Sequence, residues 1–327
     1  MFGDLDTLRL SQVLAGLQQN IHYRVRPAVA QSLADATNRV LPDAVRVPRL
    51  PQTDSRLAQL RARGLVELGP VLDGGQTEVV LSYFDTRPCY AAHVAGKSDG
   101  VGRTIEGCAT LGHYGSYRLE DVLRAPHLIE IANREDILSL VESYLGCPPT
   151  LYSVNAFWSF PGQTQPWPGI QTFHRDFDDW RFCTMFIFLT PLTAENGAHY
   201  YIPGTHRVDI VEKAYAEKGG AGSLPFTLDA MFAENADLND ACARLFADRV
   251  QTVAAPAGNA VIEDTYGLHK GDIPKSRRLL VWIRYGLYKN LANQRDALLP
   301  LPADALQGRI PETVRHRFVN RLMVAPM

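Results

Sequence analysis

Between Thr150 and Leu287 the sequence is a series of short β-type runs, most of them followed by a turn. The junctions carry Pro-Gly, Asn-Gly or Ala-Gly dipeptides, which favour turns. Short strands interrupted in this way are typical of a β-sandwich or a barrel. The predicted strands are Thr150–Phe160, Thr172–Asp176, Arg181–Leu189, Ala198–Ile202, Asn259–Thr265 and Arg278–Leu287.

Helical patterns flank and interrupt this series. Apolar residues recur at three- and four-residue steps in Leu8–Leu17 and Leu57–Leu65. A second helical block is predicted over Leu119–Leu145, and Gly146 should end it. The polar segment 208–249 also has a helical pattern, and we expect it to be an insertion between two strands that could act as a lid.

The chain is expected to form one domain over residues 1–327, because β cores with helical additions reach this length as one unit. Residues 76–116 are predicted to be irregular strands and loops. The expected parts are a largely helical support region at 1–148, a β core at 149–290 with its insertion at 208–249, and a C-terminal extension at 291–327.

Charge and cysteine content exclude several classes of protein. The formal net charge is −2 and no run of Lys or Arg occurs, so neither a nucleic acid nor a membrane surface is an expected partner. The five cysteines are scattered and include no C-x-x-C pair, which indicates a reducing compartment. We expect a cytoplasmic protein that acts on a small molecule, without a secretion signal or a membrane span. The oligomeric state is left open.

His174 and Asp176 form a His-x-Asp tripeptide. Alternate residues of a strand face the same side, so an imidazole nitrogen and a carboxylate oxygen could reach one cation. Alone, such a tripeptide is more often a surface pair. His269 follows a predicted strand, and a jelly roll would return it to the first two residues. Two histidines and one carboxylate leave three octahedral positions vacant, as iron(II) oxygenases require, whereas a closed zinc site needs a fourth protein ligand.

The last predicted strand has two unlike faces. One is purely aliphatic and should pack under helices, while the other mixes arginines with a tryptophan, which suits a wet, ligand-binding interior. Arg278 is placed to pair with a carboxylate near the metal. The aliphatic face is Leu279, Val281 and Ile283, and the mixed face is Arg278, Leu280, Trp282 and Arg284.

The predicted strand Arg181–Leu189 directs Thr184, Phe186 and Phe188 to one side. Thr184 and Phe186 could line a cosubstrate pocket, while Phe188 is equally compatible with plain core. Met185, Ile187 and Leu189 are assigned to packing. Candidates for substrate recognition are Arg175, Asp178, Asp179, Trp180, Trp158 and Arg284, although Arg175 should point away from the metal.

Three segments, taken in order, resemble the phytanoyl-CoA dioxygenase (PhyH) family of iron(II)/2-oxoglutarate oxygenases. They are FHRDFDDWRF, FIFLTPLTAENGAHYYIPGTHR, and the H-x-G-x-x-P-x-x-x-R spacing from His269 to Arg278. The resemblance covers residues 145–290 and fits the N-terminal half only loosely. The predicted fold is accordingly mainly β with helical elaborations (α+β): a double-stranded β-helix (jelly-roll, cupin-like) core flanked by N-terminal helices.

By position, the resemblance implies His174, Asp176 and His269 as iron(II) ligands and Arg278 as the partner of the distal carboxylate of 2-oxoglutarate. Phe186 matches an aromatic position beside the cosubstrate. The sequence departs from many relatives just before Arg278, where it has a doubled arginine, so Arg277 is also a candidate. His199 and His206 fall in a hairpin element of the family and are not expected to be ligands.

The implied reaction consumes O2 and 2-oxoglutarate, releases succinate and CO2, and hydroxylates an unactivated C–H bond of a small molecule. Asp176 favours hydroxylation over halogenation, while desaturation, epoxidation and ring formation stay open. One alternative is a cupin-like metalloenzyme that does not use 2-oxoglutarate, such as an isomerase, which has no use for Arg278. Another is a non-catalytic jelly-roll binding protein, which predicts neither tight iron nor succinate release.

Overall fold

The computed structural model of the chain describes residues 17–18, 21–162, 164–234, 236–287 and 300–325. The helix expected over Leu8–Leu17 lies outside these residues except for Leu17, and so do residues 291–299 of the expected C-terminal extension. Within the described part of the chain, no helix is both long and apolar enough to cross a bilayer.

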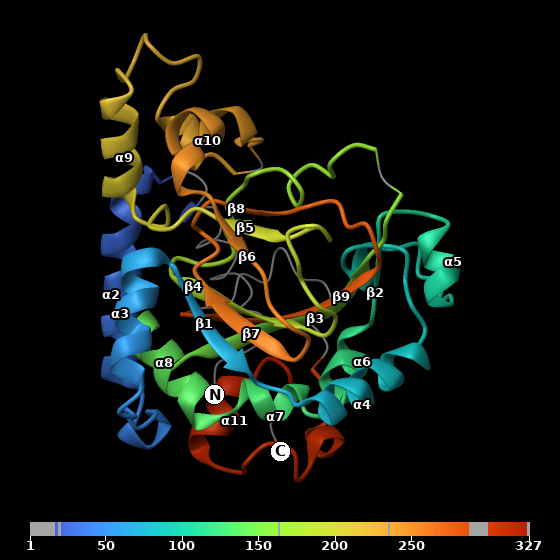
Figure 1. Cartoon of the computed structure of the whole chain (residues 1–327). Coiled ribbons are helices and arrows are strands. Elements are labelled where there is room, and N and C mark those ends of the chain that lie inside the picture. Colours follow the sequence, from blue (N-terminus) through green and yellow to red (C-terminus); the bar gives the residue numbers. More distant parts are fainter. Residues whose placement is uncertain (1–16, 19–20, 163, 235, 288–299, 326–327) are drawn as a thin grey trace.

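Two antiparallel sheets form the centre of the molecule (Figure 1). The large sheet has the order β1-β7-β4-β9-β3-β2, and the small sheet has the order β6-β5-β8. The strands are β1 (Leu65–Pro70), β2 (Tyr114–Ser116), β3 (Thr150–Ser159), β4 (Phe182–Phe188), β5 (His199–Tyr201), β6 (Gln251–Val253), β7 (Asn259–Glu263), β8 (His269–Gly271) and β9 (Arg278–Gly286).

From β3 to β9 the chain passes back and forth between these sheets. A β-bridge between His174 and His269 adds the segment before β4 to the outer side of β8. The large sheet therefore receives β3, β4, β7 and β9, and the small one receives the His174 segment, β5, β6 and β8. This is the connectivity of a jelly roll, and the predicted α+β fold class is confirmed.

Helices cover the outer face of the large sheet. Leu279, Val281 and Ile283 of β9 pack there, as predicted, in one apolar cluster with residues of α3, α4, α6, α7, α8 and α11. Figure 1 shows these helices around the lower side of the sheets, with α9 and α10 at the opposite end, next to the small sheet. The helices are α2 (Arg26–Val40), α3 (Thr53–Arg63), α4 (Gly74–Asp85), α5 (Ile105–Ala109), α6 (Leu119–Arg124), α7 (Leu128–Ala132), α8 (Glu135–Leu145), α9 (Val208–Glu217), α10 (Asn239–Phe246) and α11 (Val314–Asn320).

The inner faces of the two sheets meet in an aromatic cluster. Phe186, Phe188 and Trp282 of the large sheet are buried there with Tyr201 and Val253 of the small sheet. The mixed face of β9 therefore points inward, as its composition predicts. Its two arginines, Arg278 and Arg284, are half-buried between the sheets.

Three local expectations were wrong. Residues 76–85 are helical rather than irregular, because Asp73 and Gln76 form a capping box and α4 buries Val80 and Phe84. Strands β6 and β8 were missed, since three residues are too few to show a period. Residues 172–176 are not a regular strand, because their pairing is confined to the bridge between His174 and His269 and one hydrogen bond from Asp176 N to Thr265 O at 2.9 Å.

Candidate active site

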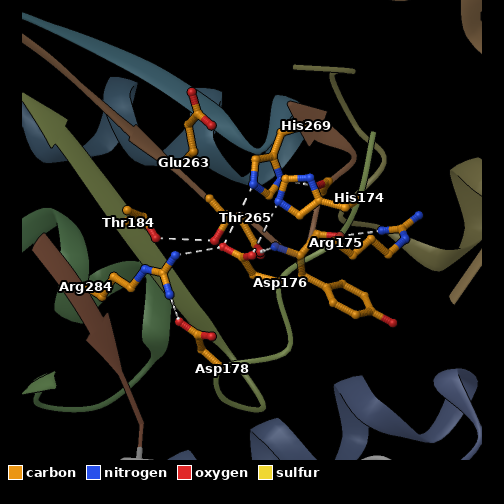
Figure 2. Close-up of polar contacts among 12 residues, drawn as sticks. His174, Arg175, Asp176, Asp178, Thr184, Glu263, Thr265, His269 and Arg284 are labelled. Carbon is orange, nitrogen blue, oxygen red and sulfur yellow. Dashed lines mark hydrogen bonds and ion pairs between the residues drawn. The ribbon is translucent and has the colours of Figure 1, made fainter. Parts of the chain in front are cut away.

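The side chains of His174, Asp176 and His269 converge between the sheets (Figure 2). One potential ligand atom from each lies within 4.8 Å of those of the other two. The backbone brings them together, because His174 N donates to His269 O at 3.1 Å and His269 N donates to His174 O at 3.2 Å. His174 Nε2 is 3.7 Å from Asp176 Oδ1, and His269 Nε2 is 3.9 Å from Asp176 Oδ2. The sequence-predicted convergence therefore exists in the structure.

Both imidazole rings are oriented by a backbone carbonyl two residues earlier. Nδ1 of His174 lies 2.9 Å from Thr172 O, and Nδ1 of His269 lies 2.9 Å from Gly267 O. A carbonyl can only accept, so each Nδ1 carries the proton. In the neutral rings the lone pair is then on Nε2, which faces Asp176. This arrangement is the one that metal-ligating histidines use.

The electrostatics favour cation binding. Burial lowers the pKa of His174 and brings the pKa of His269 down to about 3, so both rings are neutral at physiological pH. Burial alone would raise the pKa of Asp176, but the Arg284 guanidinium, together with a hydrogen bond from Thr265, lowers that pKa below its usual value. Two neutral nitrogens and one carboxylate match the donor set that divalent iron accepts with positions left open.

Arg284 connects the triad to a second carboxylate (Figure 2). Its Nη2 is 3.1 Å from Asp176 Oδ2, its Nη1 donates to Asp178, and its guanidinium lies 4.5 Å from the Trp282 ring centroid. Tyr152 donates its hydroxyl to Asp178 at 3.0 Å. The sequence placed Arg284 on the inward face of the strand but gave no sign of this bridge.

A cavity of about 710 Å³ opens beside the triad and reaches Arg278. The Arg278 guanidinium donates to Gly197 O and, at 3.2 Å, to Asp272 O. Its Nε is buried without a partner among the described residues, and burial lowers its pKa only to about 10, so the charge persists. Arg277 is on the outside, where it pairs with Glu106 at 2.9 Å. The geometry therefore favours Arg278 over Arg277 as a group that faces a ligand.

The remaining predicted pocket residues have different positions. Phe186 lines the cavity, and so does Phe188. Thr184 does not: it is fully buried, and its hydroxyl lies 3.3 Å from that of Thr265, which in turn bonds Asp176 (Figure 2). Thr184 therefore contacts Asp176 only indirectly, through Thr265, and it is not a candidate contact of the cosubstrate.

Of the recognition candidates, only Asp178 and Arg284 present side-chain charge at the cavity. Trp158 and Trp180 belong to the outer apolar core, and Asp179 is buried.

Arg175 points away from the triad, as predicted. Its guanidinium lies 4.7 and 5.0 Å from the ring centroids of Phe232 and Tyr266, and it donates to Met231 O and Thr205 O at 2.7 Å each. Met231 and Phe232 belong to a 3-10 helix (Asp229–Phe232) in the segment between α9 and α10. The residue between two metal-ligand candidates therefore anchors this segment.

Sequence reasoning missed three polar groups at the cavity. His199 lies in its wall with its Nε2 2.8 Å from Glu263 Oε2. His93, from the segment before α5, packs against the rings of Tyr114, Phe157 and Trp282 at centroid distances of 4.3 to 5.0 Å. Tyr114 has a buried hydroxyl with no partner among the described residues. His93 and Tyr114 stand in a stretch without periodicity, so no local signal marked them.

Comparison with known proteins gives a family match. Residues 112–271 match the model of the family described as phytanoyl-CoA dioxygenase (PhyH). No curated protein matches the sequence.

Three of the similar solved structures share 14–15% identity with this chain. The α-ketoglutarate-dependent epimerase SnoN from nogalamycin biosynthesis aligns over 72% of this chain and 83% of its own, with a TM-score of 0.46. HygX from Streptomyces hygroscopicus, solved with nickel and 2-oxoglutarate bound, aligns over 71% and 86% with a TM-score of 0.46. EctD from S. alaskensis aligns over 75% and 81% with a TM-score of 0.48.

The family match includes the segments that carry all three converging residues, and it ends just before Arg278. The jelly-roll connectivity and the site geometry agree with it independently. Residues 112–271, just under half of the chain, therefore match the phytanoyl-CoA dioxygenase (PhyH) family that the three sequence segments resemble.

Proposed function

We propose that this protein hydroxylates an unactivated C–H bond of a small molecule, with iron(II) held by His174, Asp176 and His269 and 2-oxoglutarate as cosubstrate. The observation that carries the proposal is the convergence of these three donors within 4.8 Å at one end of a cavity that also contains Arg278. When bound, iron and 2-oxoglutarate would supply the oxidising chemistry, in which O2 is consumed, succinate and CO2 are released, and one oxygen atom enters the substrate.

The residues of the chain contribute placement. The carbonyls of Thr172 and Gly267 fix the two rings so that each presents an Nε2 lone pair, and Arg284 holds the Asp176 carboxylate. Arg278, charged and without a partner for its Nε, is suited to bind the distal carboxylate of 2-oxoglutarate. Phe186 supplies an apolar wall near it.

The size and lining of the cavity indicate the scale of the substrate. A volume of about 710 Å³ admits a cosubstrate together with a small organic molecule. Walls of Phe157, Phe188 and Trp282 exclude water from the reacting bond.

The test is anaerobic reconstitution with iron(II) and 2-oxoglutarate. We expect a weak visible charge-transfer band that disappears in Asp176→Ala and His269→Ala, followed by succinate formation on exposure to O2. Tight iron without the band, and turnover unaffected by Arg278→Ala, would instead indicate a metalloenzyme that does not use 2-oxoglutarate. Absence of both iron binding and succinate would indicate a binding protein. Compounds that accelerate succinate release identify the substrate, and analysis of the product distinguishes hydroxylation from other oxidative outcomes.

A further inference from the structure

His199 and Glu263 form a hydrogen-bonded pair between the sheets that the proposed chemistry does not yet use. His199 lies on β5 of the small sheet and Glu263 on β7 of the large sheet, and His199 Nε2 is 2.8 Å from Glu263 Oε2. The Glu263 side chain is 0% exposed, and its Oε1 has no partner within the described residues. Burying a carboxyl group in this way costs free energy, so an apolar contact would join the two sheets more stably than this pair does.

The pair fixes how the imidazole is presented. Because Nε2 is engaged by Glu263, the ring has one hydrogen-bonding atom left, Nδ1, and nothing in the described part of the chain bonds it. The His199 side chain is 12% exposed and lines the cavity. A ring held from behind by a buried carboxylate is pre-organised toward whatever enters that space.

His199 lies between the two ends of the proposed cosubstrate site. Toward the metal end, its ring centroid is 5.8 Å from that of His269. Toward the other end, the two carbonyls that Arg278 contacts are close to it in the fold: Gly197 precedes it by two residues, and Asp272 follows its register partner Gly271. Phe186, on the same cavity wall, has its ring centroid 5.3 Å from that of His199. A molecule that extends from the triad to Arg278 must therefore pass His199.

We propose that His199, positioned by Glu263, is an additional binding residue for 2-oxoglutarate: its Nδ1–H donates to an oxygen of the dicarboxylate, while a second proton is shared between Nε2 and the Glu263 carboxyl group. The inference rests on the proposed function, because it requires a cosubstrate between the triad and Arg278. The cosubstrate would then be held at three points, namely the metal, Arg278 and His199. The third contact restricts its rotation within the cavity.

The experiment measures nickel(II) and 2-oxoglutarate affinity separately by calorimetry, with nickel as a redox-silent metal. We expect His199→Leu to raise the Kd for 2-oxoglutarate by about tenfold or more, as for the loss of a hydrogen bond to a charged group, while the Kd for nickel stays within about twofold. His199→Gln should lose less, because an amide can still bond the dicarboxylate. Glu263→Gln should give a smaller loss than His199→Leu, because it keeps a partner for Nε2.

His206→Leu is the matched control, since His206 bonds the Arg61 carbonyl at 3.1 Å and is not part of the cavity wall. If both His199 variants bind 2-oxoglutarate with wild-type affinity, the inference is wrong while the proposed function still stands. An equal loss of nickel and 2-oxoglutarate affinity, with a lowered melting temperature, assigns the pair to structure and overturns the inference too. A wild-type protein that binds nickel but no 2-oxoglutarate overturns the proposed function itself.

Discussion

Arg284 donates a hydrogen bond to Asp176, with 3.1 Å between Nη2 and Oδ2. The same guanidinium also donates to Asp178, so one half-buried cation neutralises two carboxylates beside the candidate metal site. The Asp176 side chain is consequently ionised and fixed in direction before a metal arrives, and its negative charge is shared between the protein and the metal.

Removal of Arg284 should destabilise the metal-free protein. Arg284→Met leaves Asp176 and Asp178 as neighbouring half-buried carboxylates without a cation, and the loss should approach the cost of about 3–5 kcal/mol for breaking a fully buried pair. Adding Asp178→Asn should recover part of the loss. Chemical denaturation of the metal-free proteins measures both effects. The control is Arg277→Met, which should change stability by less than about 0.5 kcal/mol because Arg277 is exposed. A loss below about 1 kcal/mol for Arg284→Met would contradict the bridge.

Substitutions of the two adjacent arginines should differ strongly in their effect on the KM for 2-oxoglutarate. Arg278→Ala should raise the KM for 2-oxoglutarate by about 100-fold, because it removes a charge-assisted contact to the distal carboxylate. Arg277→Ala should leave it within about twofold, since Arg277 pairs with Glu106 outside the cavity. Succinate formation at varied 2-oxoglutarate concentration gives both values, and the reverse order would reassign the contact to Arg277.

Gly267 is expected to tolerate no side chain. A Cβ there would lie 2.0 Å from the hydroxyl oxygen of Tyr201, which is fully buried, and the Gly267 carbonyl orients His269. Gly267→Ala should cost about 1–3 kcal/mol of stability and weaken nickel binding. Gly271→Ala, on the other side of His269, meets its nearest atom at 3.6 Å and should change neither. Adding Tyr201→Leu should partly restore Gly267→Ala, whereas a phenylalanine at 201 would keep the ring carbon Cζ that lies 2.6 Å from the added Cβ. No restoration by Tyr201→Leu would count against this steric explanation.

The stability of the protein should fall in mild acid because of His93. Burial among aromatic rings, with a further effect of Arg284, lowers the pKa of His93 to about 3 from an ordinary value of 6.5. Below pH 6.5 the unfolded chain therefore binds a proton that the folded chain refuses, so the contribution to the unfolding free energy declines by up to about 1.4 kcal/mol per pH unit. His93→Gln lacks this dependence. Urea denaturation of both proteins at pH 7.5, 5.5 and 4.5 measures the difference between their unfolding free energies. A difference that stays constant with pH would show that His93 takes up its proton as readily in the folded chain as in the unfolded chain.

The long-range part of the site could be predicted because spacing and chemistry determine it. The tripeptide at His174, the position of His269 after a strand, and the two unlike faces of β9 are local patterns with one common solution, a jelly roll. The end of the helical block at Gly146 was also predicted, because a capping residue marks it.

The parts that could not be predicted depend on contacts between distant segments. Tyr114 and His93 reach the cavity from a stretch without a period, and the His199–Glu263 pair joins two sheets across 64 residues of sequence. Thr184 was placed correctly on the inward face of its strand, but the alternation could not show that its hydroxyl contacts Thr265 and does not reach the cavity.

The anchoring of Arg175 has a consequence for protein engineering. This residue stands between His174 and Asp176 in the chain, and its guanidinium is bonded to the Met231 carbonyl in the segment that joins α9 to α10. Exchanging residues 208–249 for the corresponding loop of a relative, as a way to transplant selectivity, therefore changes the support of the metal-ligand candidates as well. Such a chimera must supply a carbonyl and an aromatic ring for this guanidinium, or its metal occupancy will fall along with its original preference.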